Sequence, residues 1–261
     1  MHTNGELARW KKIIVTAGAS GIGATTAKLM RDCGGRVSVC DIDKQALDRF
    51  ADLNPDILCL HCDVADSQAV SRYVEETLEA LDGLDILVNN AGSAGPTAVA
   101  EEIETKDWDA TISVNLSAQF YFVREVIPYL KKQHSGCIVN MSSAAGRLGL
   151  PMRAPYAAAK WGVIGLTQTL AMELGEYNIR VNAILPGAVE GERMDNVLKE
   201  KARMLNLDMA SIRNNETQNV SMKRMIEPEE VAELIIFLCS NNGRSISGQS
   251  LGVCGNIETL R

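Results

Sequence analysis

The chain has 261 residues, of which 46% are hydrophobic and 23% are charged, enough to bury the core of an α/β domain. Its net charge of −7 at pH 7 argues against nucleic acid or an anionic membrane surface as a partner. No apolar run reaches the ~18 residues of a membrane helix, and the amino-terminal segment lacks the apolar middle of a secretory signal. We therefore expect a cytoplasmic protein.

The seven cysteines are an odd number and lie in apolar segments, which favours a reducing compartment over a disulfide framework. One C-x-x-C pattern, Cys59 to Cys62 with His61 inside it, falls in a predicted strand, where residues three apart point to opposite faces. No second pair is present to complete a zinc site. With only three histidines in the chain, we expect neither a metal site nor a histidine-based catalytic triad.

Short apolar runs alternate with longer amphipathic segments, which is typical of a parallel sheet with crossover helices. Strands are predicted at residues 12–16, 37–40, 57–62, 86–89, 137–141, 179–185 and 249–253. Helices are predicted at residues 21–33, 105–132, 156–174 and 228–239. No repeat or linker divides the chain, so we expect one domain over residues 1–261. The charged, Met-rich segment at about 190–220 is predicted to be a substrate lid.

A glycine-rich turn joins the first strand to the first helix and reads Gly18-Ala19-Ser20-Gly21-Ile22-Gly23. Glycines there let the backbone approach a pyrophosphate at the helix N-terminus. Asp41 ends the next strand, where a carboxylate accepts hydrogen bonds from ribose hydroxyls and repels a 2′-phosphate. No Lys or Arg lies in the turn or directly after Asp41, so NAD is favoured over NADP. Asp41 could instead be a helix N-cap.

Tyr156 and Lys160 lie four residues apart on a predicted helix and therefore share one face. A free phenol titrates near pH ~10, and a neighbouring ammonium favours the phenolate. The preceding strand ends in Ser142 and Ser143, and a serine at that place could meet the tyrosine hydroxyl. These residues predict a proton-transfer site at the mouth of the sheet.

Several motifs recur in one order along the chain: the glycine turn, Asp63-Val64, Asn89-Asn90-Ala91-Gly92, Asn115, Ser143, Tyr156-x-x-x-Lys160 and Pro186-Gly187. From Lys12 to about Asn256 the chain resembles the short-chain dehydrogenase/reductase family. The resemblance implies a single-domain, Rossmann-like, doubly wound α/β fold with a seven-stranded parallel sheet and helices on both faces. It also implies hydride transfer at C4 of a nicotinamide.

The resemblance further implies roles for four catalytic residues. Tyr156 would be the general acid–base, and Lys160 would lower the pKa of its phenol and hold the nicotinamide ribose. Ser143 would orient the substrate oxygen, with Ser142 only its neighbour. Asn115 would organise a helix kink and a water that relays protons from Lys160.

The same resemblance implies a set of cofactor contacts around the turn and the neighbouring strand ends. Ser20 and Ile22 would contact the phosphates within the turn formed by Gly18 and Gly23. Asp63 and Val64 would flank the adenine, Asn90 would lie beside the ribose, and Val189, just past Pro186, would fix the carboxamide through its backbone.

Three positions depart from the family pattern. Ala17 stands where the first glycine of the turn is expected, which is tolerable if its φ is negative. Gly191 stands where a threonine is often found, and Cys254 where Asp or Gly is more familiar.

Substrate choice is expected to lie in the loop 144–153, in the residues after Gly92 and in the segment 190–220. Arg153, Arg193 and Ser143 are the candidate substrate residues, and Arg147 lies in the same loop. An arginine at the mouth can bind a carboxylate, phosphate or sulfonate, or can be a solvated loop residue. Acidic residues near Glu190 can hydrogen-bond sugar hydroxyls or solvate a lid helix.

We therefore expect oxidation of a secondary alcohol with NAD, with a small polyol or an aldose-like sugar, possibly acidic, as substrate. The alternatives are a ketone reductase of the 3-oxoacyl thioester type and a catalytically silent NAD-binding sensor or scaffold. The helix 156–174 is apolar on too many faces to cover only a sheet. Its second apolar face suggests a subunit interface, and the resemblance implies a homotetramer.

Overall fold

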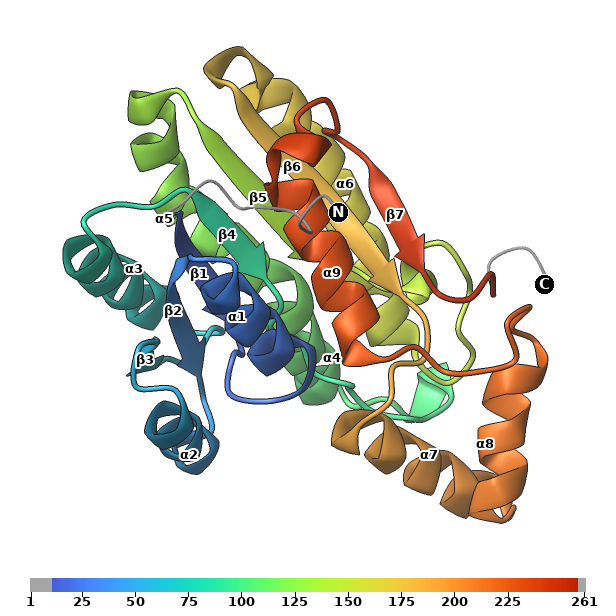
Figure 1. The fold of residues 1–261 in the computed structure, drawn as a ribbon. Helices are drawn as coiled ribbons and strands as arrows, with labels where there is room; N and C mark the ends of the chain where they lie inside the picture. The colour runs from blue at the N-terminus through green and yellow to red at the C-terminus, as the bar shows by residue number, and fades with distance from the viewer. Residues whose placement is uncertain (1–10, 258–261) are drawn as a thin grey trace, which may run out of the picture.

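The computed structural model describes residues 11–257, and its strands form one seven-stranded sheet (Figure 1). All neighbouring strands are parallel, in the order β3-β2-β1-β4-β5-β6-β7. The strands are β1 (Lys12–Thr16), β2 (Arg36–Asp41), β3 (Leu58–His61), β4 (Ile86–Asn89), β5 (Gly136–Met141), β6 (Ile179–Pro186) and β7 (Ser250–Val253). The strand order reverses direction between β1 and β4, and this confirms the predicted doubly wound sheet.

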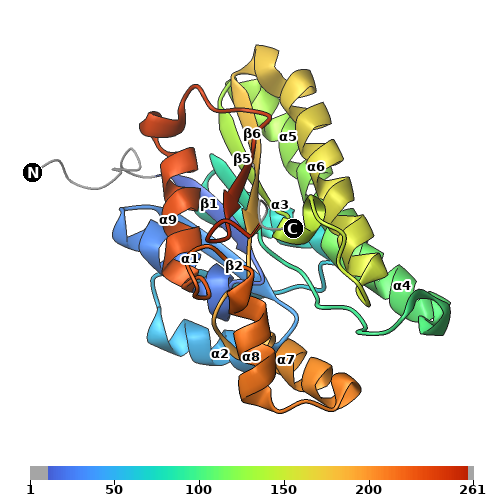
Figure 2. The same cartoon turned by 90° about the vertical axis from the view of Figure 1, so that its right-hand side faces the viewer.

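Helices cover both faces of the sheet. One layer holds α1 (Gly21–Asp32), α2 (Lys44–Leu53) and α9 (Pro228–Cys239), and the other holds α3 (Ser67–Leu81), α5 (Ala118–Gln133) and α6 (Ala154–Leu174). Figure 2 views the sheet nearly edge-on between these layers. The hairpin of α7 (Glu192–Leu205) and α8 (Met209–Gln218) projects beyond the carboxyl ends of the strands. Within residues 11–257, no helix combines the length and apolar character needed to cross a bilayer.

Successive residues of a strand point to opposite faces of the sheet, and each face has its own hydrophobic core. Both faces are buried, which explains why the strands are unbroken apolar runs in the sequence. Ile13 and Val15 of β1 pack in the core under α1 and α9. Ile14 between them packs in the core under α3, α5 and α6. The same alternation sends Cys59 to the first core and Cys62 to the second, as predicted for the C-x-x-C pattern.

Two helices, α2 and α3, were not among the elements that the sequence pattern predicted individually. Each starts at an aspartate whose carboxylate accepts a hydrogen bond from the first helical turn. Asp43 accepts from Ala46 N at 3.0 Å, and Asp66 accepts from Gln68 N at 2.8 Å. These N-caps are the sequence signals that mark both helices.

The long helix predicted at 105–132 is in fact interrupted. The structure has α4 (Thr105–Ile112), a π-helical turn at Ser113–Ser117, and then α5. A π turn widens the helix by one residue and frees a carbonyl from the regular ladder, often at a functional site. Asn115 is the central residue of this turn and is buried.

The glycine turn departs from the sequence expectation at Ala17. Its φ is +51°, so the condition that φ be negative is not met. A left-handed conformation costs a non-glycine residue about 1–2 kcal/mol. The next residue, Gly18, has no room for a side chain, because a Cβ there would stand 2.5 Å from Val39 Cβ. The turn therefore holds a strained alanine beside an obligatory glycine.

Substituting Ala17→Gly should stabilise the protein. Relief of the left-handed strain exceeds the added entropy of the unfolded chain, so we expect about 0.5–1 kcal/mol and a melting temperature higher by about 1–3 °C. The matched control is Ala19→Gly in the same turn, where φ is not positive and glycine should destabilise. Scanning calorimetry on both variants provides the measurement, and equal losses of stability would show that Ala17 is unstrained.

Candidate active site

The predicted catalytic residues come from three elements that meet at the carboxyl edge of the sheet. Ser143 follows the end of β5, Tyr156 and Lys160 lie in the first turns of α6, and Asn115 lies in the π turn. Pro155 occupies one of the first positions of α6, where its missing N–H costs no hydrogen bond. The helix therefore begins early enough to present Tyr156 and Lys160 at the strand ends.

Lys160 is 2% exposed, and its Nζ donates a hydrogen bond to the Met141 carbonyl at 2.8 Å. The same nitrogen lies 5.6 Å from the centroid of the Tyr156 ring. Burial lowers the pKa of Lys160 to about 8, a shift that nearby Arg193 reinforces and Tyr156 opposes. At neutral pH the group is therefore still an ammonium.

The phenol of Tyr156 titrates below its ordinary value. Burial raises its pKa, but the charge of Lys160 acts in the opposite direction, together with Arg193, a hydrogen bond to Ser143, and Arg153. The combined effect of these groups exceeds that of burial, and the pKa lies below 10. This arrangement makes the phenol a group that can accept and return a proton.

The two serines after β5 have different roles. Ser143 Oγ accepts from Ala145 N at 3.2 Å, and its hydroxyl helps to lower the pKa of Tyr156. Ser142 Oγ donates to the Lys160 carbonyl at 2.8 Å and ties the strand end to α6. Ser142 thus acts on the fold, while Ser143 faces the phenol.

Asn115 is held by its side-chain amide, whose Nδ2 donates to the Thr111 carbonyl at 2.9 Å and to Ser93 Oγ at 3.1 Å. Its Oδ1 is buried without a hydrogen-bond partner. A π-helical turn interrupts the helix at Asn115, the residue for which the resemblance implied a kink. The backbone carbonyl of Asn115 accepts a hydrogen bond from Gln119 Nε2 at 3.1 Å.

Gln119 was not identified from the sequence. Its Nε2 also donates to the Met141 carbonyl at 3.1 Å, the same carbonyl that holds Lys160. The side chain therefore links the π turn to the end of β5 beneath the ammonium. The only signal for Gln119 in the sequence is its position four residues after Asn115 on a predicted helix. That spacing does not mark a functional residue unless the π turn is already known.

The turn before α1 has the features of an anion site. Ser20 is the N-cap residue of α1, yet its hydroxyl makes no capping hydrogen bond. The amides of the first helical turn and this hydroxyl face the same end of the helix. Gly23 must be glycine because a Cβ there would stand 2.1 Å from the Ala17 carbonyl oxygen. These residues fit a pyrophosphate.

Asp41 is fixed by two backbone amides, accepting from Ala19 N at 3.2 Å and from Asp43 N at 3.1 Å. The N-cap of α2 is Asp43, so the alternative role of Asp41 as that cap is wrong. The bond to Ala19 ties the carboxylate to the glycine turn. Asp41 is thus fixed beside the turn, as a ribose-binding carboxylate requires.

The other predicted cofactor residues border the same edge. Asn90 Nδ2 donates to the carbonyls of Thr16 and Ala17 at 2.9 and 3.1 Å, so it braces the glycine turn. Thr16 Oγ1 accepts from Asn90 N at 2.9 Å, a brace that the motif did not reveal. Asp63 accepts from Ala65 N at 2.9 Å just beyond β3, and the neighbouring Val64 is buried.

The segment after β6 is joined to the chain that returns from the hairpin by a bridge between Val189 and Ile226. In this bridge Glu190 N donates to the Ile226 carbonyl, and Ile226 N donates to the Ala188 carbonyl. The N–H and C=O of Val189 itself take no part in the bridge. Gly191 has φ +132°, which a threonine would rarely adopt. Cys254 packs under Gly187, where a Cβ would meet it at 3.1 Å.

The candidate substrate residues separate into two groups. Arg153 is 5% exposed, and its Cζ lies 5.0 Å from the Tyr156 ring centroid. Arg193, on the first turn of α7, also acts on Tyr156. Arg147 instead donates to the Ser250 carbonyl on the edge strand β7.

The hairpin of α7 and α8 has a small core of its own, formed by Leu198, Ile212 and Met225. Glu190, which we considered for sugar hydroxyls, is ion-paired with Arg213 instead. The apolar residues considered for closing over a substrate are exposed at the tip of the hairpin: Met204, Leu205, Leu207 and Met209.

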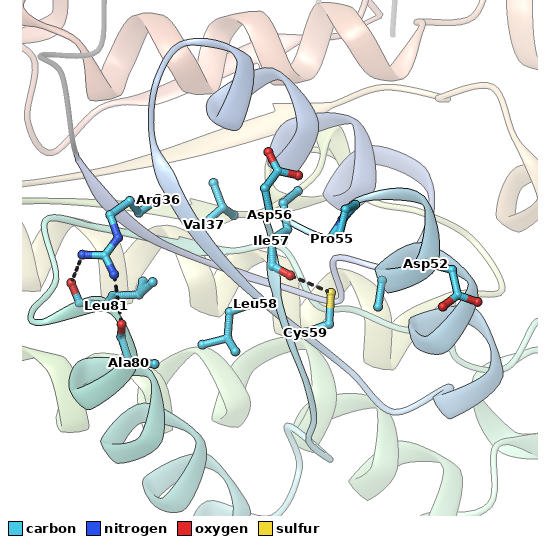
Figure 3. Close-up of a pocket in the computed structure, with 11 residues that line it drawn as sticks. Arg36, Val37, Asp52, Pro55, Asp56, Ile57, Leu58, Cys59, Ala80 and Leu81 are labelled. Atoms are coloured by element: carbon cyan, nitrogen blue, oxygen red, sulfur yellow. Dashed lines mark hydrogen bonds between the residues drawn. The ribbon is translucent and has the colours of Figure 1, made fainter.

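A hollow in the described chain lies away from all these residues (Figure 3). It has a volume of about 560 Å³ and borders the starts of β2 and β3. Arg36 on its rim donates to the carbonyls of Ala80 and Leu81 at the end of α3. Ligands of open α/β sheets bind at the opposite, carboxyl edge, so we assign this hollow no role in binding.

The two cysteines of the C-x-x-C pattern lie in different cores on opposite faces of the sheet. No group of three metal-ligating side chains occurs within residues 11–257. Burial raises the pKa of the Cys59 thiol to about 11, whereas a hydrogen bond with Cys40 lowers the pKa of Cys62. All seven cysteines are free.

Comparison with known proteins agrees with this geometry. The family model described as "Enoyl-(Acyl carrier protein) reductase" matches residues 16–255. A 3-oxoacyl-[acyl-carrier-protein] reductase of Thermotoga maritima is 38% identical over 255 residues, covering 95% of this chain and 97% of the relative. Two crystal structures match along nearly their full lengths.

The first structure is an actinorhodin polyketide ketoreductase variant with NADPH, with a TM-score of 0.92 and 28% identity, covering 98% of this chain and 100% of that one. The second is an NAD⁺-bound xylitol dehydrogenase, with a TM-score of 0.90 and 27% identity over the same shares. The relatives thus include binders of both nicotinamide cofactors. The chain belongs to the short-chain dehydrogenase/reductase family of oxidoreductases.

Proposed function

We propose that the protein is an NAD-dependent dehydrogenase of secondary alcohols, with Tyr156 as its acid–base. The observation that carries this proposal is the position of the Tyr156 phenol at the carboxyl edge of the sheet, where the buried Lys160 nitrogen lies 5.6 Å from the centroid of its ring. The lowered pKa of the phenol is consistent with that geometry. The same arrangement argues against a silent NAD sensor, because a binding protein has no need of an acidified phenol.

Bound NAD would supply the acceptor for a hydride from the carbinol carbon. The protein's part is the proton. Ser143 orients the substrate hydroxyl, and the Tyr156 phenolate takes the hydroxyl proton as the carbonyl forms. Lys160 stabilises the phenolate by its charge, and the Met141 carbonyl and Gln119 keep the ammonium in place.

The cofactor residues support NAD over NADP. Ser20 and the first amides of α1, with Ile22 behind them, would hold the pyrophosphate between Gly18 and Gly23. Asp41 would bind the adenosine ribose and repel a 2′-phosphate. The remaining proposed contacts fall at three parts of the cofactor: Asp63 and Val64 at the adenine, Asn90, Tyr156 and Lys160 at the ribose, and Pro186 and Val189 at the carboxamide.

For the substrate we propose a small polyol or an aldose-like sugar, possibly acidic, and xylitol dehydrogenase is a structural relative that acts on such a compound. A second candidate is reduction of a 3-oxoacyl thioester, favoured by the identity of 38% to the Thermotoga reductase. Asp41 weighs against this candidate if the reductant is NADPH. The α7–α8 hairpin would act as the lid over either substrate.

We also propose a homotetramer in a reducing cytoplasm. Large apolar side chains of the second face are exposed on α6 and α5: Trp161 at 53%, Met172 at 86% and Phe120 at 47%. A face of this kind on helices that already cover a sheet fits a second copy of the chain.

The acid–base role predicts a specific pH profile. Oxidation requires the phenolate, so kcat/KM should rise with pH through the pKa of Tyr156, with a midpoint below 10. Tyr156→Phe should lower kcat by at least about 100-fold, with NAD binding by fluorescence as the test of folding. Lys160→Met should move the rising limb to higher pH, because burial then acts on the phenol without the ammonium. An unmoved limb would contradict the assignment.

The role of Asp41 predicts cofactor preference. Asp41→Asn keeps an oxygen to accept from Ala19 N but removes the charge that repels a 2′-phosphate. We expect the wild type to bind NAD at least about 10-fold more tightly than NADP, and the variant to lose most of that difference. Dissociation constants for both cofactors measure the effect, with Asp52→Asn on α2 as the control. Equal affinities in the wild type would refute the argument.

The oligomer is tested by mass. Light scattering at micromolar concentration should give four times the chain mass of 28.3 kDa. Trp161→Glu on the exposed face of α6 should shift the distribution to smaller species, because a buried charge opposes association. A monomeric mass for the wild type would exclude the proposed interface.

A further inference from the structure

Arg153 is buried and forms no ion pair with a carboxylate of the described chain. Its side chain is 5% exposed. One terminal nitrogen donates to the Ala94 carbonyl, while the Nε is buried and has no partner. Burial lowers the pKa of this guanidinium and Arg193 lowers it further, and the two together outweigh the raising effects of the Tyr156 phenolate and Glu216. Such a group is costly to keep unless a ligand compensates it.

The position of Arg153 is as informative as its burial. It is the N-cap residue of α6, three residues before Tyr156, and its Cζ lies 5.0 Å from the Tyr156 ring centroid. Its loop is joined to the segment after Gly92 by a hydrogen bond from Ala98 N to the Met152 carbonyl at 3.0 Å. The guanidinium is therefore fixed beside the phenol.

A second unpaired guanidinium reaches the same place from the hairpin. A Cβ on Gly92 would stand 3.7 Å from a terminal nitrogen of Arg193 and 3.6 Å from Lys160 Nζ. Arg193 forms no ion pair with any carboxylate of the described chain. Three cations thus surround the phenol in a chain whose net charge is −7.

The acidic residues of the hairpin do not neutralise this charge. Glu190 and Asp195 both pair with Arg213. Glu216, whose charge raises the pKa of Arg153, is itself paired with Lys201. The excess positive charge is therefore a property of the site.

We propose that Arg153, with Arg193, binds a carboxylate of the substrate, so that the substrate is a hydroxy acid. This inference rests on the dehydrogenase function proposed above. A guanidinium fork matches a carboxylate in shape and charge. Arg153 is hydrogen-bonded to the Ala94 carbonyl in the segment after Gly92. The cofactor phosphates are assigned to a different place, the N-terminus of α1 at Ser20. The anion at Arg153 is thus a group of the substrate.

The carboxylate takes no part in the bond changes. The carbinol C–H gives its hydride to C4 of the oxidised nicotinamide, the O–H proton passes to the Tyr156 phenolate, and the carbon–oxygen double bond forms. Arg153 holds the carboxylate so that the hydroxyl faces Tyr156. Among polyols this selects sugar acids over neutral sugar alcohols.

Three matched pairs of compounds test the proposal, each an acid and the alcohol with CH₂OH in its place. They are gluconate and glucitol, lactate and propane-1,2-diol, and 3-hydroxybutyrate and butane-1,3-diol. With NAD, we expect the wild type to prefer the acid of at least one pair by about 10- to 100-fold in kcat/KM. Arg153→Met should abolish most of this preference, chiefly through KM.

Two further variants sharpen the comparison. Arg153→Lys keeps the charge but not the fork, so its preference should be intermediate, and it also serves if the methionine variant does not fold. Arg244→Met removes an exposed guanidinium beside α9, far from Tyr156, and should keep the full preference.

A binding measurement decides the subsite without turnover. In the presence of NAD, malonate should raise the melting temperature of the wild type more than malonamide does at equal ionic strength. Arg153→Met should remove this difference. An equal response to malonate and malonamide would overturn the subsite.

The remaining outcomes separate the two proposals. Preference for the diols, or an acid preference that survives Arg153→Met, overturns the subsite but leaves the dehydrogenase intact. Absence of NAD binding overturns the dehydrogenase. If Arg193→Met weakens NAD binding and leaves the acid preference unchanged, Arg193 serves the cofactor phosphates and the two-arginine site is wrong.

Discussion

The site depends on an ammonium that is buried without a carboxylate. Lys160 donates to the Met141 carbonyl, and no carboxylate of the described chain forms an ion pair with it. This is costly, as the lowered pKa of about 8 records. Because no carboxylate within residues 11–257 is paired with Lys160, the charge of its ammonium acts on the Tyr156 phenol. A carboxylate beside Lys160 would have stabilised the ammonium and cancelled its effect on the phenol.

One carbonyl organises the supporting structure. The Met141 oxygen accepts from both Lys160 and Gln119, and Gln119 also donates to the carbonyl of Asn115 in the π turn. The end of β5, the break between α4 and α5, and the start of α6 are therefore fixed relative to one another by a few hydrogen bonds. A ring of hydrogen bonds that involves three elements leaves the ammonium little freedom to move away from the phenol.

The sequence predicted those features that depend on local pattern. The strands were found because their residues are buried on both faces, and Tyr156 and Lys160 were found because their spacing places them on one helical face. The π turn and Gln119 were missed because they depend on contacts between distant elements. The positive φ of Ala17 was likewise not visible, since alanine normally avoids that conformation.

The structure changes which charged residues are candidates for binding the substrate. In the sequence, Glu190 and Arg153 are equally available, one for sugar hydroxyls and the other for an anion. The structure pairs Glu190 with Arg213 and leaves the buried Arg153 without an acid. Electrostatic attraction of a ligand comes from charges that the protein leaves unpaired, and burial strengthens it. In a chain with a net charge of −7, a buried cation without an ion-pair partner beside the reacting phenol therefore bears more on the choice of substrate than the overall composition does.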